Sequence, residues 1–115
     1  QSAGDAEFCL RSGGIIIMEK STAVEVLSAL AQENRIDIFR TIVEYQPAGL
    51  PAGKIGEILA LPGATLSFHL TQLKQAGLII STREGRSLIY SANTDAIDEL
   101  AQFLQQDCCS KNLDN

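Results

Sequence analysis

The apolar residues in the middle of the chain first follow a helical period. Leu66, Leu70 and Leu73 recur at the i, i+4, i+7 spacing that places side chains on one face of an amphipathic helix. The turn at residues 61–64 opens this helix, and Gly77 is the residue type favoured just past a helix C-terminus. The opposite face is polar without being rich in Glu or Lys, which is unusual for a face that only meets solvent.

The pattern then changes to one that is typical of β-strands. Residues 78–82 and 87–91 are short runs containing β-branched and aromatic residues that favour strands, and they are joined by the sequence Arg83-Glu84-Gly85-Arg86. A helix followed by a two-stranded hairpin with arginines at its tip is the arrangement with which a winged helix-turn-helix meets DNA.

Four other segments have helical periodicity, and they predict the helices at residues 20–32, 34–45, 51–60 and 93–108. The apolar residues expected on their inner faces are Val24, Leu27 and Leu30, then Ile36, Phe39, Ile42 and Val43, then Ile55, Ile58 and Leu59, then Ile97, Leu100, Ala101 and Leu104. The expected fold class is mainly α (α+β), in the order α-α-α-α-β-β-α. A short strand is expected before the third helix, near residues 48–50.

The length of 115 residues favours one domain. We expect a flexible N-terminal extension over residues 1–17, a DNA-binding and dimerisation domain over residues 18–109, and a flexible tail over residues 110–115. Met18 is the only methionine, and it is a candidate natural start.

The net charge of −5 argues against a non-specific nucleic-acid binder, but the charge is unevenly distributed. Between residues 50 and 90 there are four basic and two acidic residues, whereas residues 91–115 hold five acidic residues and one lysine. The expected DNA-binding face is therefore mildly positive. We expect modest affinity that depends strongly on salt and improves when two copies bind together.

Three motifs together resemble the ArsR/SmtB family of winged-helix metalloregulatory repressors. The most specific is Ala64-Thr65-Leu66-Ser67-Phe68-His69-Leu70 followed by Leu73-Lys74-Gln75-Ala76-Gly77-Leu78-Ile79, and the others are Leu27-x-x-Leu30-Ala31-x-x-x-Arg35-x-x-Ile38 and the hairpin tip before Tyr90. The resemblance covers about residues 24–109. It implies a homodimer that packs through its first and last helices, binds double-stranded operator DNA with dyad symmetry, and leaves when an inducer binds.

The residues expected to contact DNA are Gly63, Ala64, Thr65, Ser67, Phe68, His69, Gln72, Lys74, Arg83 and Arg86. Hydroxyl and amide groups suit base edges and phosphates, an aromatic ring suits a thymine methyl group, and arginines suit phosphates or the minor groove. His69 is the sole histidine and lacks partner ligands, so a structural or DNA-facing role is favoured over a metal site. Relatives often carry Gln or Arg where this chain has Gly63 and Ala64, which reduces direct base reading.

Cysteines are the remaining candidate chemistry. The adjacent pair Cys108 and Cys109 offers two soft thiolates that suit trivalent arsenic or antimony, and Cys9 or an exogenous thiol is a candidate third donor. The two family zinc and cadmium sites lack the necessary cysteines or histidines here. One alternative is a repressor that senses oxidants or reactive sulfur through the same thiols. Another is a thiol-rich binding protein whose winged helix contacts protein instead of DNA.

The sequence contains neither a phosphate-binding glycine loop nor a pattern of catalytic residues, so we expect no enzyme activity and no organic cofactor. It also contains no apolar run long enough for a membrane span. The expected location is cytoplasmic.

Overall fold

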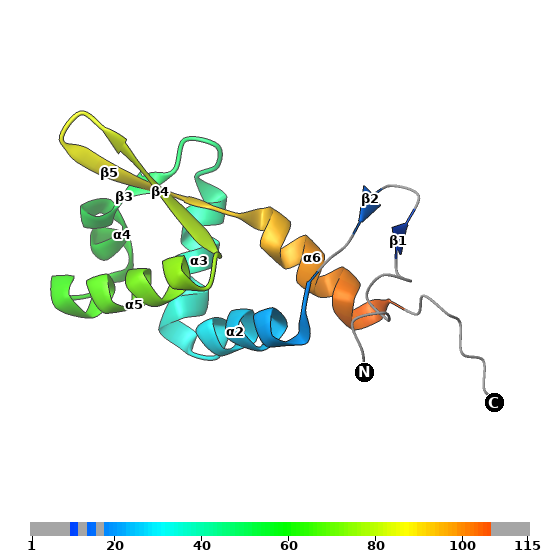
Figure 1. Cartoon of the computed structure of the whole chain (residues 1–115). Helices are drawn as coiled ribbons and strands as arrows, with labels where there is room; N and C mark the ends of the chain where they lie inside the picture. Colours follow the sequence, from blue (N-terminus) through cyan, green and yellow to red (C-terminus); the bar gives the residue numbers. More distant parts are fainter. Residues whose placement is uncertain (1–9, 12–13, 16–17, 107–115) are drawn as a thin grey trace.

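The computed structural model describes residues 10–11, 14–15 and 18–106 (Figure 1). The main body runs in the order α2 (Lys20–Leu30), α3 (Glu33–Glu44), β3 (Leu50–Pro51), α4 (Ala52–Leu59), α5 (Gly63–Gln75), β4 (Ile79–Glu84), β5 (Ser87–Ala92) and α6 (Thr94–Gln105). This order confirms the mainly helical winged helix-turn-helix, including the short strand before the third of these helices. Before the body, β1 (Leu10–Arg11) pairs with β2 (Gly14–Ile15), in a segment where we expected no regular structure.

The sheet of the body has three antiparallel strands in the order β3-β5-β4. β4 and β5 form the hairpin, whose register pairs Ser81 with Tyr90 and closes at Glu84 opposite Ser87. Only two residues therefore make the turn. The first of them, Gly85, has a φ of +64°, in the left-handed region that two-residue hairpin turns require and that glycine tolerates best.

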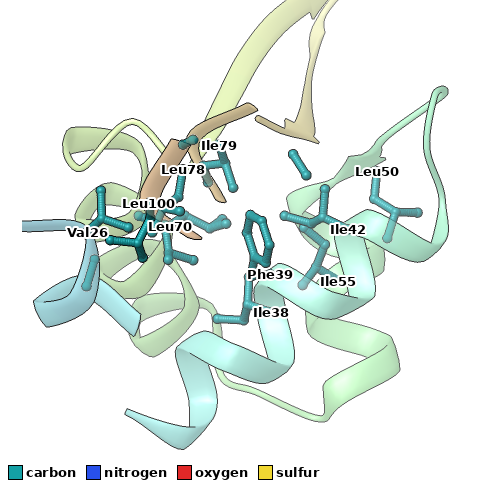
Figure 2. Packing of buried hydrophobic residues seen from close by; sticks show 14 of the residues in the cluster. Val26, Ile38, Phe39, Ile42, Leu50, Ile55, Leu70, Leu78, Ile79 and Leu100 are labelled. Atoms are coloured by element: carbon teal, nitrogen blue, oxygen red, sulfur yellow. The ribbon is translucent and has the colours of Figure 1, made fainter. Parts of the chain in front are cut away.

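The core lies where α3, α5 and the base of the hairpin meet. Figure 2 shows Phe39 at its centre, with Ile42 and Ile55 on one side and Leu70 on the other. The side chains with almost no exposed surface are Val26, Ile38, Ile42, Ile55, Leu73, Leu78 and Ile79. Burying each large aliphatic side chain of this kind contributes about 1.5–3 kcal/mol.

The first of these helices, α2, has two apolar faces, and the inner one is not the one we expected. Ala23 and Val26 are buried in the protomer, whereas Val24 is 55% and Leu27 is 45% exposed. The expectation that Val24 and Leu27 face the core is therefore wrong for a single chain. The reason is that α2 has two apolar faces offset by one residue, one with Ala23 and Val26 and one with Val24 and Leu27. The face with the smaller side chains is the one that packs against α3 and α5.

Similar corrections apply to the other helices. In α3, Phe39 and Ile42 are buried as expected, but Ile38 replaces Ile36 and Val43, which both stay exposed. The remaining expected core residues that are exposed instead are Ile58, Ala101 and Leu104. The sequence therefore carries more apolar surface than one protomer buries.

The last helix, α6, extends away from the side of the molecule that carries α4, α5 and the hairpin (Figure 1). Its main neighbour is α2, and Ala96 and Leu100 are its buried residues. Across the part of the chain that the structure describes, no helix combines the length and apolar character needed to cross a membrane.

Candidate nucleic-acid interface

The turn between α4 and α5 sets the angle of the helix-turn-helix. α4 ends at Leu59 and is capped by Ala60, which has a φ of +57°, and the backbone N–H of Leu61 donates to the carbonyl oxygen of Gly56 at 3.1 Å. Pro62 follows as the N-cap residue of α5, whose backbone is extended there. This left-handed cap followed by a proline ends α4 sharply and lets α5 leave in a new direction.

The outward face of α5 presents most of the residues that we expected to contact DNA. Those that are exposed are Gly63, Ala64, Thr65, Ser67, Phe68 and Lys74, while Gln72 is partly buried. Phe68 is 56% exposed although it is a large aromatic residue. An exposed phenylalanine beside hydroxyl-bearing residues is suited to the mixture of methyl groups and hydrogen-bonding atoms in a major groove.

His69 departs from this pattern. Its burial fits the structural role that we considered for it, whereas the expectation that it lies on the polar face with the other DNA contacts is wrong. It is buried, with 4% of its surface exposed, on the same face as Leu66, Leu70 and Leu73. The physical reason is the helical spacing itself, because residue 69 completes the i, i+3, i+4, i+7 set that begins at residue 66. A direct base contact from this side chain would require α5 to rotate.

The polar atom of the buried histidine is satisfied by a residue that the sequence analysis did not place in the site. Arg35, in α3, donates its Nε–H to Nδ1 of His69 at 3.0 Å. The guanidinium carbon of Arg35 also lies 5.6 Å from the centroid of the Phe68 ring. Arg35 therefore bridges α3 to the inner and outer faces of α5. No local spacing signals this contact, because the two residues are 34 positions apart.

This environment fixes the protonation of the histidine. Burial lowers the pKa of His69 below its ordinary value of 6.5, and the nearby positive charge of Arg35 lowers it further. The imidazole is consequently neutral at pH 7, with Nδ1 accepting from Arg35 and the proton on Nε2. A neutral side chain is the form that can accept this hydrogen bond.

The hairpin supplies two more of the expected DNA contacts. Arg83 lies in β4 opposite Leu88, and Arg86 is the second residue of the turn. Both are exposed, and the only ion pair in the described part of the chain joins Lys54 to Glu57 in α4. The two arginines are thus available to phosphates at the tip of the wing.

The cysteines lie outside the described residues, so the expected arsenic or antimony ligands Cys9, Cys108 and Cys109 remain a prediction. Among residues 10–11, 14–15 and 18–106, no group of three His, Cys, Asp or Glu side chains is close enough to hold a metal ion.

Comparison with known proteins agrees with this geometry. A family profile described as a helix-turn-helix domain matches residues 30–82. The chain is 30% identical over 94 residues to YbzH of Bacillus subtilis, an HTH-type transcriptional regulator, covering 71% of this chain and 94% of YbzH. It is 28% identical over 97 residues to the transcriptional activator HlyU of Vibrio cholerae, covering 83% and 87% of the two chains.

Solved structures extend the likeness to three dimensions. An ArsR-like transcriptional regulator from Rhodococcus sp. RHA1 superposes with a TM-score of 0.68 at 25% identity, over 73% of this chain and 76% of that one. The homodimeric winged helix-turn-helix domain Mb0332 from Mycobacterium bovis has the same fold, with a TM-score of 0.64 at 22% identity, over 90% and 84% of the chains. The chain therefore belongs to the ArsR-like family of winged helix-turn-helix proteins and is a DNA-binding transcriptional regulator, not an enzyme.

Proposed function

We propose that the protein is a homodimeric repressor that binds an operator with dyad symmetry and is released by a thiophilic inducer. The observation that carries the DNA-binding part is the outward face of α5, where Thr65, Ser67 and Phe68 are exposed. The two arginines of the wing are exposed as well. A dimer bound across a promoter blocks polymerase by occupancy alone. It needs no further partner surface to repress.

The apolar surface of the outer helices supports the dimer. Val24 and Leu27 are exposed on α2, and Leu104, which is 60% exposed, lies on α6, the helix that packs against α2. Large aliphatic side chains gain about 25 cal/mol for each Å² that a partner covers. The Mycobacterium bovis relative with the same fold is described as homodimeric. A second copy that covers α2 and α6 would set the distance between the two copies of α5.

The proposed inducer site follows from the chain order. In the sequence, Cys108 follows the end of α6 at Gln105 after two intervening residues, so a ligand held by Cys108 and Cys109 would act close to the end of the proposed dimer helix. Trivalent arsenic or antimony suits two soft thiolates, and Cys9 or a free thiol would complete three-coordination. Since coupling is reciprocal, an inducer that weakens DNA binding must itself bind DNA-bound protein more weakly by the same factor.

The experiment is a fluorescence anisotropy titration of the full chain on its own upstream DNA, followed by arsenite. We expect arsenite to release DNA from the wild type but not from the Cys108→Ser/Cys109→Ser variant, while Cys9→Ser tests the third ligand. A Phe68→Ala variant is expected to weaken DNA binding before any inducer is added. Saturable binding that ignores arsenite in every variant would reject the arsenic assignment and keep the regulator.

One specific observation favours a second inducer class, since a solved relative is described as reduced HlyU, a form named by its redox state. For this chain, the alternative is oxidation or persulfidation of the same thiols. Release by peroxide or persulfide, with no response to arsenite, would select it. The direction of regulation is tested separately by in vitro transcription, because the Vibrio relative is named an activator. Increased transcript on adding the protein would reject repression.

A further inference from the structure

Arg35 lies beside α5, the helix proposed to enter the major groove and called the recognition helix below. Its side chain has hydrogen-bond donors that its neighbours in the protein do not use. Its Nε–H is committed to His69, and the Phe68 ring lies beside its guanidinium carbon. The guanidinium has five N–H donors, of which four belong to the two terminal nitrogens. Within the described residues, no carboxylate forms an ion pair with Arg35. The side chain is only partly buried, so these donors can be reached from outside.

The surroundings of this charge suit an anion. A shallow groove of about 380 Å³ runs between α2, α3 and α5. Its lining residues are Val24, Glu25, Ser28, Ala29, Arg35, Gln72, Gln75 and Ala76. The guanidinium and the amides of Gln72 and Gln75 are hydrogen-bond donors, and they come from α3 and α5. Glu25, from α2, is the one acidic residue of the groove.

We infer that Arg35 is a DNA-backbone contact, with its terminal nitrogens donating to a phosphate beside the major groove that α5 enters. This inference rests on the proposed DNA binding through α5. Phosphate contacts make up half to two-thirds of protein–DNA hydrogen bonds, and they fix the register of the protein on the duplex. A guanidinium already held by His69 and Phe68 loses little freedom when it binds a phosphate. The contact would couple the position of α3 to that of the recognition helix.

The competing role for Arg35 is purely internal, as the hydrogen-bond partner that keeps His69 and Phe68 in place. Both roles predict weaker DNA binding when Arg35 is replaced, so affinity alone does not separate them. The salt dependence does, because each neutralised phosphate contributes about −0.9 to the slope of log Kobs against log[salt]. A residue that only supports α5 would change the affinity and leave this slope unchanged.

The experiment measures operator binding by the full chain from about 50 to 200 mM salt, the range over which phosphate contacts have large effects. Arg35→Met removes the charge and Arg35→Lys keeps it. Arg40→Met is the matched control, since Arg40 is an exposed arginine of the same helix. For a dimer with two copies of Arg35, we expect Arg35→Met to flatten the slope by about 1.8, and Arg35→Lys and Arg40→Met to keep the wild-type slope.

A second measurement changes the DNA as well as the protein, and it locates the phosphate that Arg35 contacts. Single methylphosphonate substitutions remove one phosphate charge of the operator at a time. We expect one position in each half-site to weaken the wild type and to have no further effect on Arg35→Met. Two results would overturn the inference: Arg35→Met binding more weakly with the wild-type slope, or the same methylphosphonate positions affecting both proteins equally. Absence of operator binding by the wild type would instead reject the DNA contacts proposed for α5, and this inference with them.

Discussion

The side-chain amide of Gln46 exchanges two hydrogen bonds with the backbone of Ala92. The backbone N–H of Ala92 donates to Oε1 of Gln46 at 2.9 Å, and Nε2 of Gln46 donates to the carbonyl oxygen of Ala92 at 3.3 Å. The next residue, Asn93, donates its backbone N–H to the carbonyl oxygen of Leu78 and its side-chain Nδ2–H to the carbonyl oxygen of Gly77, with a donor–acceptor distance of 2.8 Å in each bond. These four bonds hold the last residues of β5 against the end of α3 and the start of β4. They therefore fix the point from which α6 leaves the body.

Replacing Gln46 should weaken this joint. Gln46→Ala leaves the N–H and carbonyl of the buried Ala92 without their partner, so we expect a loss of about 1–3 kcal/mol in the free energy of unfolding, measured by urea denaturation. Glu44→Ala, at an exposed neighbouring position, should change it by no more than about 0.5 kcal/mol. Equal effects of the two substitutions would show that the joint contributes nothing specific.

Gly49 and Gly53 make a matched pair of glycines on either side of β3. A Cβ atom at Gly49 would lie 2.6 Å from the carbonyl oxygen of Tyr90, and the φ of Gly49 is +80°. Gly49→Ala should therefore push β3 away from β5 and cost about 2 kcal/mol or more. Gly53, within α4, has nothing within 4 Å of such an atom, so Gly53→Ala should stabilise the helix by about 0.5–1 kcal/mol. Thermal unfolding of both variants checks the opposite signs.

Stability should fall in mildly acidic solution because of His69. Above its ordinary pKa of 6.5, the imidazole is neutral in both the folded and the unfolded chain. Below that pH, His69 is protonated in the unfolded chain. In the folded chain it stays neutral until the pH falls to its lowered pKa, because burial and the charge of Arg35 disfavour the protonated form. The free energy of unfolding should thus decrease by up to about 1.4 kcal/mol per pH unit within this window.

The measurement is a series of denaturant titrations from about pH 8 to pH 5.5, around the ordinary histidine value, at one protein concentration. His69→Gln keeps a hydrogen-bond acceptor for Arg35 but cannot titrate, so it should lose the dependence between pH 6.5 and 5.5. His69 is the chain's only histidine, which makes the comparison direct. A wild-type stability that stays constant over this range would contradict the prediction.

The exposed apolar residues of α2 and α6 should control association. Leu27→Glu and Leu104→Glu place charges on the surface proposed to be covered by a second copy, and we expect each to convert a dimer into a monomer in sedimentation velocity. Ile58→Glu, on α4, is the control, because Ile58 is also exposed but lies away from these helices. A dimer that survives both substitutions, or that Ile58→Glu dissociates, would place the interface elsewhere.

Local sequence determined the elements of this protein and their order. The spacing of Leu66, Leu70 and Leu73 predicted α5, and the two strand-like runs around Gly85 predicted the hairpin, because helical and strand periods depend only on nearby residues. The same reasoning predicted that Thr65 and Ser67 lie on the exposed face of α5. It also contained the information that His69 is inside, since that residue belongs to the same helical spacing as the three leucines.

Tertiary structure decided which of several possible faces is buried and which distant residues meet. α2 has one apolar face with Ala23 and another with Val24, and only its packing against α3, α5 and α6 selects between them. The contact of Arg35 with His69 joins residues that are 34 positions apart, so the hydrophobic periodicity of the sequence could not predict it. The direction of α6 likewise depends on Gln46 reaching across 46 positions to Ala92. Such contacts form only when separate elements pack together, and no local pattern encodes them.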